Sequence, residues 1–140
     1  MVKIFVLSQY STSAPTQLGV GRIKIDGGPL YDLATVKQLV DDPDCINLLT
    51  RICIGEVHKL FDSDTGQVAA LIQALDLHNY IDSEWCENGK TGVAACDAYG
   101  IRRVEEVAST GKSATVEYFL KFAVGKTGKL VLLVSCHLSK

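Results

Sequence analysis

The sequence contains no long hydrophobic run and no closely paired cysteines. Residues 1–10 hold one lysine and a short apolar run, too short for the core of a signal peptide and far too short to cross a bilayer. The five cysteines are an odd number without a Cys-x-x-Cys pair, so they fit neither a complete disulfide framework nor a zinc clip. We expect a cytoplasmic protein without a membrane segment, whose thiols are reduced and mostly buried.

A surplus of positive charge is also missing. The chain has 14 Lys and Arg against 16 Asp and Glu, which gives a formal net charge of −2. Such a protein does not attract nucleic acid as a whole, so an RNA ligand would have to be held by a local basic patch. Because 47% of the 140 residues are hydrophobic, the chain can bury one core, and we predict a single domain over residues 1–140.

Composition and periodicity divide this domain into three parts: an N-terminal arm (1–29), a helical layer (30–78) and an antiparallel sheet (79–138). Residues 2–7 are rich in Ile, Val and Phe and predict a short strand. This strand either adds to the edge of the sheet or pairs with a neighbouring subunit. In the second case the chain would form a homodimer.

Two helices of the middle part have clear start signals. The first begins at Asp32, a favourable N-cap residue, and must stop before Pro43. Another begins at Asp64, which is spaced from Gln67 as in a capping box. Apolar residues follow both starts at helical spacing, so one face of each helix is expected to cover the sheet.

Between them, the pair Asp42 and Pro43 predicts a further helix start. Ile46, Leu49, Ile52 and Cys53 would form its apolar stripe, and Gly55 would end or bend it.

After Leu77 the periodicity becomes that of strands. Asn88-Gly89 predicts a two-residue hairpin turn, which sets Trp85 opposite Gly92 and Tyr80 opposite Asp97. In that register Tyr80, Asp82 and Asp97 share one face of the sheet.

A polar run over 105–114 is interpreted as a link to a last hairpin that turns at 125–128. The nearly continuous apolar stretch 130–134 predicts a strand in the middle of the sheet, covered on both faces. The fold class predicted is α+β, with N-terminal helices packed on a mainly antiparallel, twisted sheet.

Short motifs give little support for known chemistry. Gly111-Lys112-Ser113 resembles the end of a phosphate-binding loop, but Glu106 stands where that loop needs a glycine. The three histidines are too scattered for a local zinc pattern, and we expect neither a metal ion nor a cofactor. Four basic residues form either a phosphate-binding patch or solvated strand ends: Arg102, Arg103, Lys121 and Lys126.

A family resemblance runs from residue 30 to about residue 138. It is carried, in order, by LYDLATVKQLV (30–40), a helix ending in Ala74-Leu75, Tyr80 with Ser83, CDAY (96–99), FLKFAV (119–124) and LVLLVSCH (130–137). In this order and spacing the chain resembles the MqsR family of bacterial toxin–antitoxin systems, whose members are mRNA interferases with a RelE-like fold. The resemblance implies an RNA substrate and an antitoxin protein as partner.

The residues that such a nuclease uses are replaced. Asp82 stands in place of the catalytic lysine of the family's FYKS segment, and Cys96 in place of the glutamine of WQDVY. Phe119 takes the position of the active-site tyrosine and His137 that of the closing lysine, whereas Lys121 is kept. The chain therefore has fewer cationic side chains to stabilise the charge of a phosphorane than the family's active site provides.

Two main hypotheses follow. The first is a toxin or toxin relative that binds RNA, either with or without cleaving it. Its acid–base residues would be His137, Asp82 and Asp97, and its phosphate- and base-binding residues Lys121, Arg102, Arg103, Tyr99 and Tyr80. The second is a non-catalytic binding domain that acts through protein or small-ligand contacts, favoured by the acidic composition and by Trp85, which is expected to be exposed. An unrelated enzyme that uses Asp82, Asp97 and His137 is a third reading.

Overall fold

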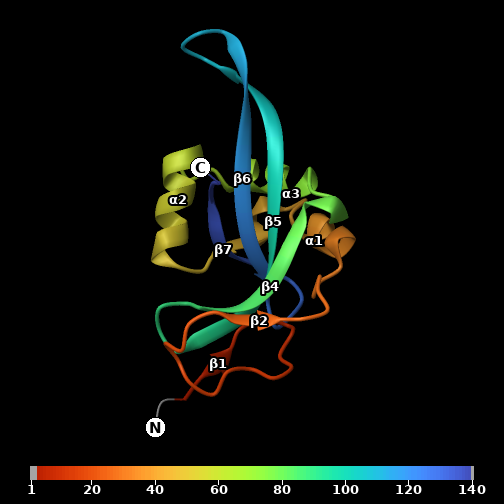
Figure 1. Cartoon of the computed structure of the whole chain (residues 1–140), viewed down its shortest axis with the longest axis vertical. Coiled ribbons are helices and arrows are strands. Elements are labelled where there is room, and N and C mark those ends of the chain that lie inside the picture. Colours follow the sequence, from red (N-terminus) through yellow and green to blue (C-terminus); the bar gives the residue numbers. More distant parts are fainter. Residues whose placement is uncertain (1–2, 140) are drawn as a thin grey trace.

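A computed structural model of the chain describes residues 3–139 and has an α+β architecture (Figure 1). In this part of the chain, three α-helices cover one face of a seven-stranded open sheet with the strand order β2-β4-β5-β6-β7-β3, and β1 pairs with β5. The strands are β1 (Phe5–Val6), β2 (Ile23–Ile25), β3 (Ile46–Leu48), β4 (Tyr80–Glu87), β5 (Gly92–Val107), β6 (Lys112–Val124) and β7 (Val131–Leu138). The helices are α1 (Leu33–Leu39), α2 (Arg51–Phe61) and α3 (Thr65–Gln73).

The first and last predicted helix starts are confirmed. The Asp32 side chain accepts a hydrogen bond from the Thr35 amide at the start of α1, and Asp64 accepts one from the Gly66 amide at the start of α3. Each carboxylate satisfies an amide that the helix itself leaves without a partner.

The start signal at Asp42 and Pro43 is confirmed, because the Asp42 side chain accepts a hydrogen bond from the Asp44 amide, but the longer helix predicted to follow it is wrong. Pro43–Cys45 form only a 3₁₀ turn, and the chain then enters β3, which pairs in parallel with β7. Helix α2 begins at Arg51, where the Thr50 hydroxyl accepts from the Cys53 amide, and it runs through Gly55 to Phe61. Pairing with a strand distant in sequence overrides the local helical pattern. The helices are therefore not purely N-terminal, since β1 and β2 precede them and β3 lies among them.

The register predicted for β4 and β5 is also wrong. Trp85 lies opposite Ala95 and Tyr80 opposite Tyr99. The Asn88 side chain accepts hydrogen bonds from the Lys90 and Gly92 amides, which makes the turn longer than two residues. At Asp82, the observed pairing is shifted from the predicted one by an odd number of residues. Asp82 therefore lies on the face of the sheet opposite Asp97.

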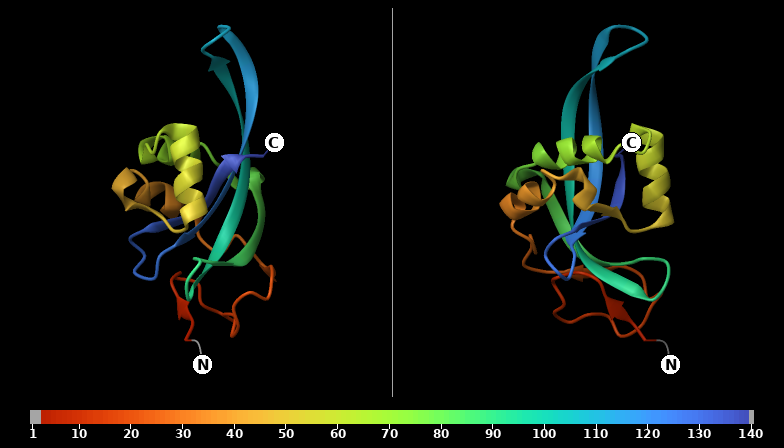
Figure 2. Two further views of the ribbon diagram at one scale, coloured as in Figure 1. Left: turned by 90° about the vertical axis from the view of Figure 1, so that its left-hand side faces the viewer. Right: turned by 180° about the vertical axis from the view of Figure 1, so that it is seen from behind.

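A two-stranded ribbon extends beyond the rest of the molecule. β4 pairs with β5 only as far as Tyr99, and β7 pairs with β6 only as far as Tyr118. Residues 102–117, here called the projecting hairpin, therefore stand alone at the top of Figure 1 and in both views of Figure 2. The polar run 105–114, interpreted from sequence as a link, is the end of this hairpin.

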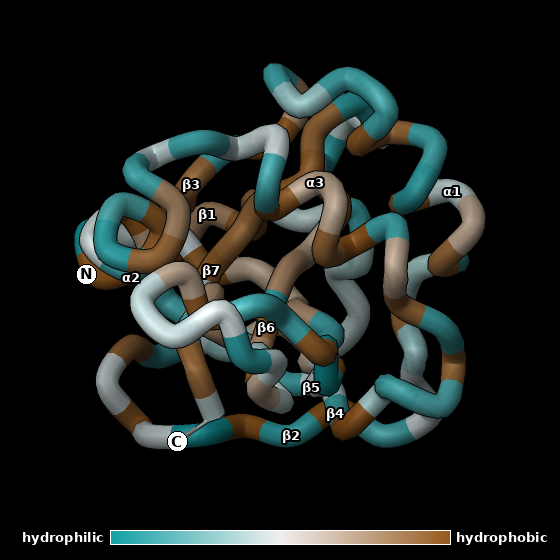
Figure 3. Tube along the Cα trace, turned by 90° about the horizontal axis from the view of Figure 1, so that it is seen from above, coloured by the Kyte–Doolittle hydropathy of each residue, from teal (hydrophilic) through white to brown (hydrophobic). Residues whose placement is uncertain are grey.

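The core lies between the helices and the sheet. Figure 3 shows apolar stretches along β7 and α3, which contribute Val68, Leu71, Ile72, Val131 and Leu133 to the interior. The prediction of an interior strand at 130–134 is confirmed, because β7 lies between β6 and β3. None of the helices in residues 3–139 is long and apolar enough to span a membrane.

Candidate functional site

The face of the sheet that turns away from the helices carries half of the predicted site residues: Asp82, Arg102, Lys121 and His137. The left view of Figure 2 shows the helices gathered on one side of the strands only. On the other side, Gly100, Phe119 and His137 lie opposite one another across β5, β6 and β7. The next row holds Lys121 and Ser135, and β4 adds Asp82 and Glu84. We call this surface the open face.

His137 belongs to an aromatic pair on the open face. Its ring stacks on Phe119 with centroids 5.1 Å apart and an angle of 24° between the planes. The Lys121 ammonium lies 5.6 Å from the centroid of Phe119, and His137 Nδ1 lies 2.9 Å from the carbonyl oxygen of Leu138. Within residues 3–139, no carboxylate forms an ion pair with this imidazole.

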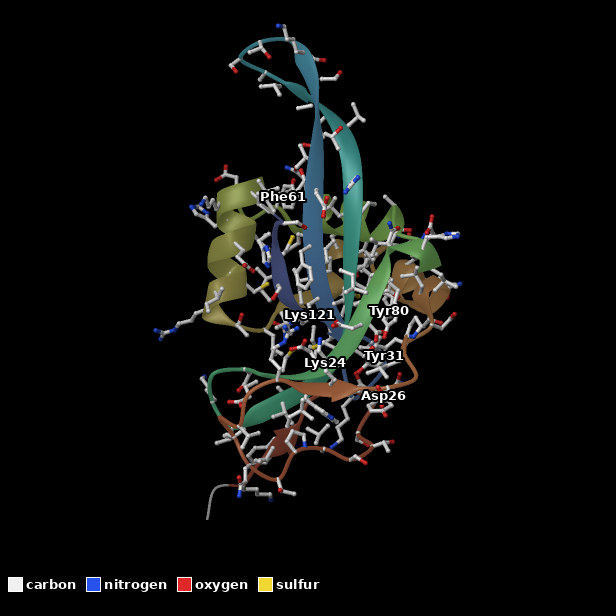
Figure 4. All side chains as sticks on the ribbon, in the orientation of Figure 1. Lys24, Asp26, Tyr31, Phe61, Tyr80 and Lys121 are labelled. Carbon is white, nitrogen blue, oxygen red and sulfur yellow. The ribbon has the colours of Figure 1, made fainter. Side chains whose placement is uncertain are left out.

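A buried carboxylate, Glu84, organises the cations beside this pair. Its side chain is only 6% exposed, and it accepts hydrogen bonds from Arg22. Lys24 and Lys121 bring their ammonium nitrogens to 3.4 and 3.5 Å from the Glu84 oxygens. Lys24 also forms an ion pair with Asp82, and Figure 4 shows Lys24 and Lys121 near one another low on the sheet.

These five residues, Arg22, Lys24, Asp82, Glu84 and Lys121, are called the Glu84 cluster. Burial alone would raise the pKa of Glu84, but the hydrogen bond from Arg22 and the charge of Lys121 outweigh it and hold that pKa below its ordinary value. The carboxylate is therefore ionised and neutralised by its neighbours. Sequence analysis missed this cluster, because Arg22 and Glu84 are 62 residues apart.

Two thiols continue the open face below this cluster. Cys86 and Cys96 sit on neighbouring strands in diagonal positions, since Cys86 lies opposite Ala94 and Cys96 opposite Glu84. A hydrogen bond with Cys96 lowers the pKa of the Cys86 thiol, and the Lys121 charge acts in the same direction. Both thiols are free, and Cys96 is fully buried, as expected from sequence.

Asp97 lies on the opposite, helix-covered face. Its carboxylate accepts hydrogen bonds from the Leu30 amide at 2.9 Å, the Tyr31 amide at 3.1 Å and the Ser83 hydroxyl at 2.6 Å. Asp97 has no solvent-accessible surface, and its burial raises the pKa of the carboxyl despite these donors. This group, here called the Asp97 anchor, ties the segment before α1 to the sheet.

The two predicted base-stacking tyrosines belong to the same layer as the Asp97 anchor. Tyr99 is fully buried and stacks on Phe122, with centroids 5.3 Å apart and planes 2° from parallel. Tyr80 meets Tyr99 edge-on, and its hydroxyl shares a 2.7 Å hydrogen bond with Ser83. Burial raises the pKa of Tyr99 far above its ordinary value. The Tyr99 ring is thus a core element.

The predicted basic patch is split between two faces. Arg102 pairs with Glu117 at 2.9 Å on the projecting hairpin. Arg103 points to the other side, where it borders a cavity of about 440 Å³ together with Phe61 and Tyr118. Lys121 lies within the Glu84 cluster, so the arginines and this lysine do not form one continuous surface.

The structure also contains a cavity that the sequence did not indicate. It measures about 810 Å³ and lies between the start of α2 and the β4–β5 turn, with Val134 and Ser135 of β7 also lining it. Two isoleucines of α2 border it, Ile52 with 75% and Ile54 with 50% of its surface exposed. The predicted stripe placed Ile52 in the core, and this is wrong. Cys53, Val57 and Phe61 form the buried face of α2 instead.

Trp85 is buried, contrary to the expectation of an exposed ring. It packs with Val93 and Ala95 against the N-terminal arm and lies 6.2 Å from the ring of Tyr10.

Comparison of the chain with protein-family models, curated proteins and solved structures gave no match. Within residues 3–139, no group of three or more His, Cys, Asp or Glu side chains is placed to hold a metal ion.

Proposed function

We propose that this chain is a non-catalytic binding domain that holds a peptide segment of another protein in the cavity between α2 and the β4–β5 turn. The separation of the acid–base residues supports a role without catalysis. Asp97 is held in the core by three donors, whereas Asp82 pairs with Lys24 on the opposite face of the sheet. RNA cleavage by one general acid and one general base requires both groups within reach of the same substrate bond.

The residues that line the cavity indicate which kind of ligand it would bind. Ile52 and Ile54 expose apolar surface beside a concave site, and such surface marks binding sites on soluble proteins. Arg51 and Lys90 border the same cavity against a single carboxylate, that of Glu87. The start of α2 adds the positive end of a helix dipole. A segment with apolar side chains flanked by Asp or Glu complements these features.

A library of random linear peptides, selected on the immobilised full chain, tests this proposal. We expect enriched peptides that combine apolar anchors with carboxylates, and Ile54→Glu should abolish their binding. Ile81→Glu is a matched control, since Ile81 is 52% exposed and lies outside the cavity. Failure to enrich such peptides, or equal loss of binding in both variants, would contradict the proposal.

RNA binding on the open face is a second candidate function, favoured by the pair of Phe119 and His137 with Lys121 above the ring. Aromatic rings beside cations hold single-stranded bases and phosphates. RNA binding ranks second because the cations near this surface are already paired with carboxylates. Lys121, Lys24 and Arg22 already face Glu84, and Arg102 already faces Glu117.

Fluorescence anisotropy with labelled single-stranded RNA distinguishes the two functions. RNA bound at the open face should dissociate as salt increases and should be lost in Phe119→Ala, while Ile54→Glu leaves it unchanged. If the chain does not bind RNA at low salt, RNA binding is excluded as its function. The hypothesis of an RNA-cleaving toxin with an antitoxin partner is then excluded as well. If binding is found, arrest of bacterial growth that His137→Ala relieves would support the toxin reading.

A further inference from the structure

One edge of the projecting hairpin is without a strand partner. β4 follows β5 only to Tyr99, while β5 itself continues to Val107. Across the described residues, the other neighbour of this segment is β6, which occupies the opposite edge. The backbone groups on the outer edge of residues 100–107 therefore face solvent. A free edge of this kind accepts another strand unless the sequence prevents it.

The sequence along this edge is complementary to itself. Residues 102–106 read Arg-Arg-Val-Glu-Glu, with Val104 at the centre. If two copies run antiparallel and meet at Val104, Arg103 of each copy lies opposite Glu105 of the other. Arg102 then lies opposite Glu106, so every charge on the segment meets an opposite charge. Cross-strand pairs of opposite charge stabilise an antiparallel ladder, and like charges destabilise it.

The faces of the two strands also match. Arg102, Val104 and Glu106 alternate with Arg103 and Glu105, so each pair named above lies on one side of the joined sheet. Val104 is 74% exposed, so the hairpin leaves this apolar side chain uncovered. Across the two-fold axis it would meet its own copy and be covered.

The space that the second copy needs is present. In this register Val107 and Ala108 of one copy lie beside Ile101 and Gly100 of the other. A cavity of about 430 Å³ borders Gly100 and Ile101 there, with Ile81 beside it at 52% exposure. Figure 1 shows the hairpin extending clear of the helices and of β4, so the two bodies would lie at opposite ends of the joined ribbons.

From this complementarity we infer that the chain forms a symmetric homodimer by antiparallel pairing of β5 with β5 of a second copy, centred on Val104. The interface is isologous, and it closes with two copies because each contributes the same edge. It joins two sheets into one continuous sheet and leaves the cavity at α2 free in both copies. The dimer is thus independent of the peptide-binding function proposed above.

Charge exchange tests the register. Light scattering of the full chain should give twice the monomer mass of 15.2 kDa for the wild type. Glu106→Arg places two arginines opposite each other twice per dimer and should give a monomer. Adding Arg102→Glu to the same chain, together with Glu117→Arg to keep an ion pair within the hairpin, restores opposite charges between the copies and should restore the dimer. A monomeric wild type at high concentration, or a Glu106→Arg chain that stays dimeric, would overturn the inference.

Cross-linking tests the centre of symmetry even where charge exchange disturbs the hairpin. Val104→Cys places a thiol opposite its own copy, so mild oxidation should yield a disulfide-linked dimer well above the wild-type background from native thiols. Val107→Cys is the control, because two copies of residue 107 would be separated by about 20 Å at roughly 3.3 Å per residue. Equal cross-linking of both variants, or of neither, would contradict the register. Circular dichroism of each variant confirms that the chain is folded.

Discussion

Two buried carboxylates, Glu84 and Asp97, lie on neighbouring strands and face opposite sides of the same sheet. Glu84 meets three cationic side chains, Arg22, Lys24 and Lys121. Asp97 meets two backbone amides and a hydroxyl. Cationic neighbours lower the pKa of Glu84, whereas burial among neutral donors raises the pKa of Asp97. The nature of the partner thus decides which protonation state the fold favours.

The difference also separates two structural roles. The Glu84 cluster joins long, partly exposed side chains and attaches β2 to the sheet. The Asp97 anchor fixes backbone atoms of the segment that leads into α1, and it has no contact with solvent. Loss of the anchor should therefore cost more stability than loss of the cluster, and neither site needs a reaction to explain its acidic residue.

Asp97→Ala should have the largest effect. It removes the acceptor of three donors and leaves the Leu30 and Tyr31 amides unsatisfied in the interior. We expect a loss of about 3–5 kcal/mol in the free energy of unfolding, measured by urea denaturation. Asp97→Asn keeps one acceptor oxygen and should lose less. Equal stability of Asp97→Ala and wild type would show that the anchor has no structural role.

Glu84→Ala should have an intermediate effect. Lys121, whose side chain is only 13% exposed, would lose its carboxylate, but Arg22 and Lys24 can turn to water because they are 66% and 49% exposed. We expect a loss of about 1–2 kcal/mol in the same denaturation experiment. A loss larger than that of Asp97→Ala would reverse the comparison.

The two carboxylates should respond to pH with opposite signs. Because the pKa of Glu84 is lowered on folding, its stabilising contribution is present above its unfolded-state pKa and is lost as pH falls through the folded value. Because the pKa of Asp97 is raised, its contribution is present below its unfolded-state pKa and is lost as pH rises through the folded value.

Urea denaturation at a series of acidic pH values checks both signs. In Glu84→Gln, the free energy of unfolding should fall less towards low pH than in the wild type. In Asp97→Asn, it should fall less as pH rises from the unfolded-state pKa of Asp97 to its folded value. If both variants changed the profile in the same direction, the two environments would not differ as described.

Lys24→Ala should have the smallest effect. Its side chain is 49% exposed, and its partner Asp82 is 33% exposed. Ion pairs of this kind contribute about 0–1 kcal/mol, so stability should barely change. A loss as large as that of Glu84→Ala would mean that Lys24 rather than Glu84 organises the cluster.

The sequence predicts those elements whose signals are local. Asp32 and Asp64 cap α1 and α3 as expected, because an N-cap acts on amides within three residues of itself. The apolar stretch after residue 130 likewise predicts an interior strand. The broad α+β class follows from these elements and from the strand-like periodicity after Leu77.

The candidate site was less predictable because it depends on register and on long-range partners. Asn88 uses its side chain to accept two amides, and the longer turn moves Asp82 away from Asp97. Arg22 comes to Glu84 from the N-terminal arm, 62 residues away in the chain. Most side chains of the projecting hairpin are exposed, so its polar composition resembles that of a link rather than a strand.

We propose that Asp82, Glu84 and Asp97 serve the fold rather than an RNA-cleaving reaction. Incubation of the full chain with single-stranded RNA, followed by electrophoresis, tests it most directly. We expect the RNA to stay intact with the wild type and with His137→Ala. Fragments that appear with the wild type and disappear with His137→Ala would contradict the account, because they would require an acid–base pair that the separation of Asp82 and Asp97 does not provide.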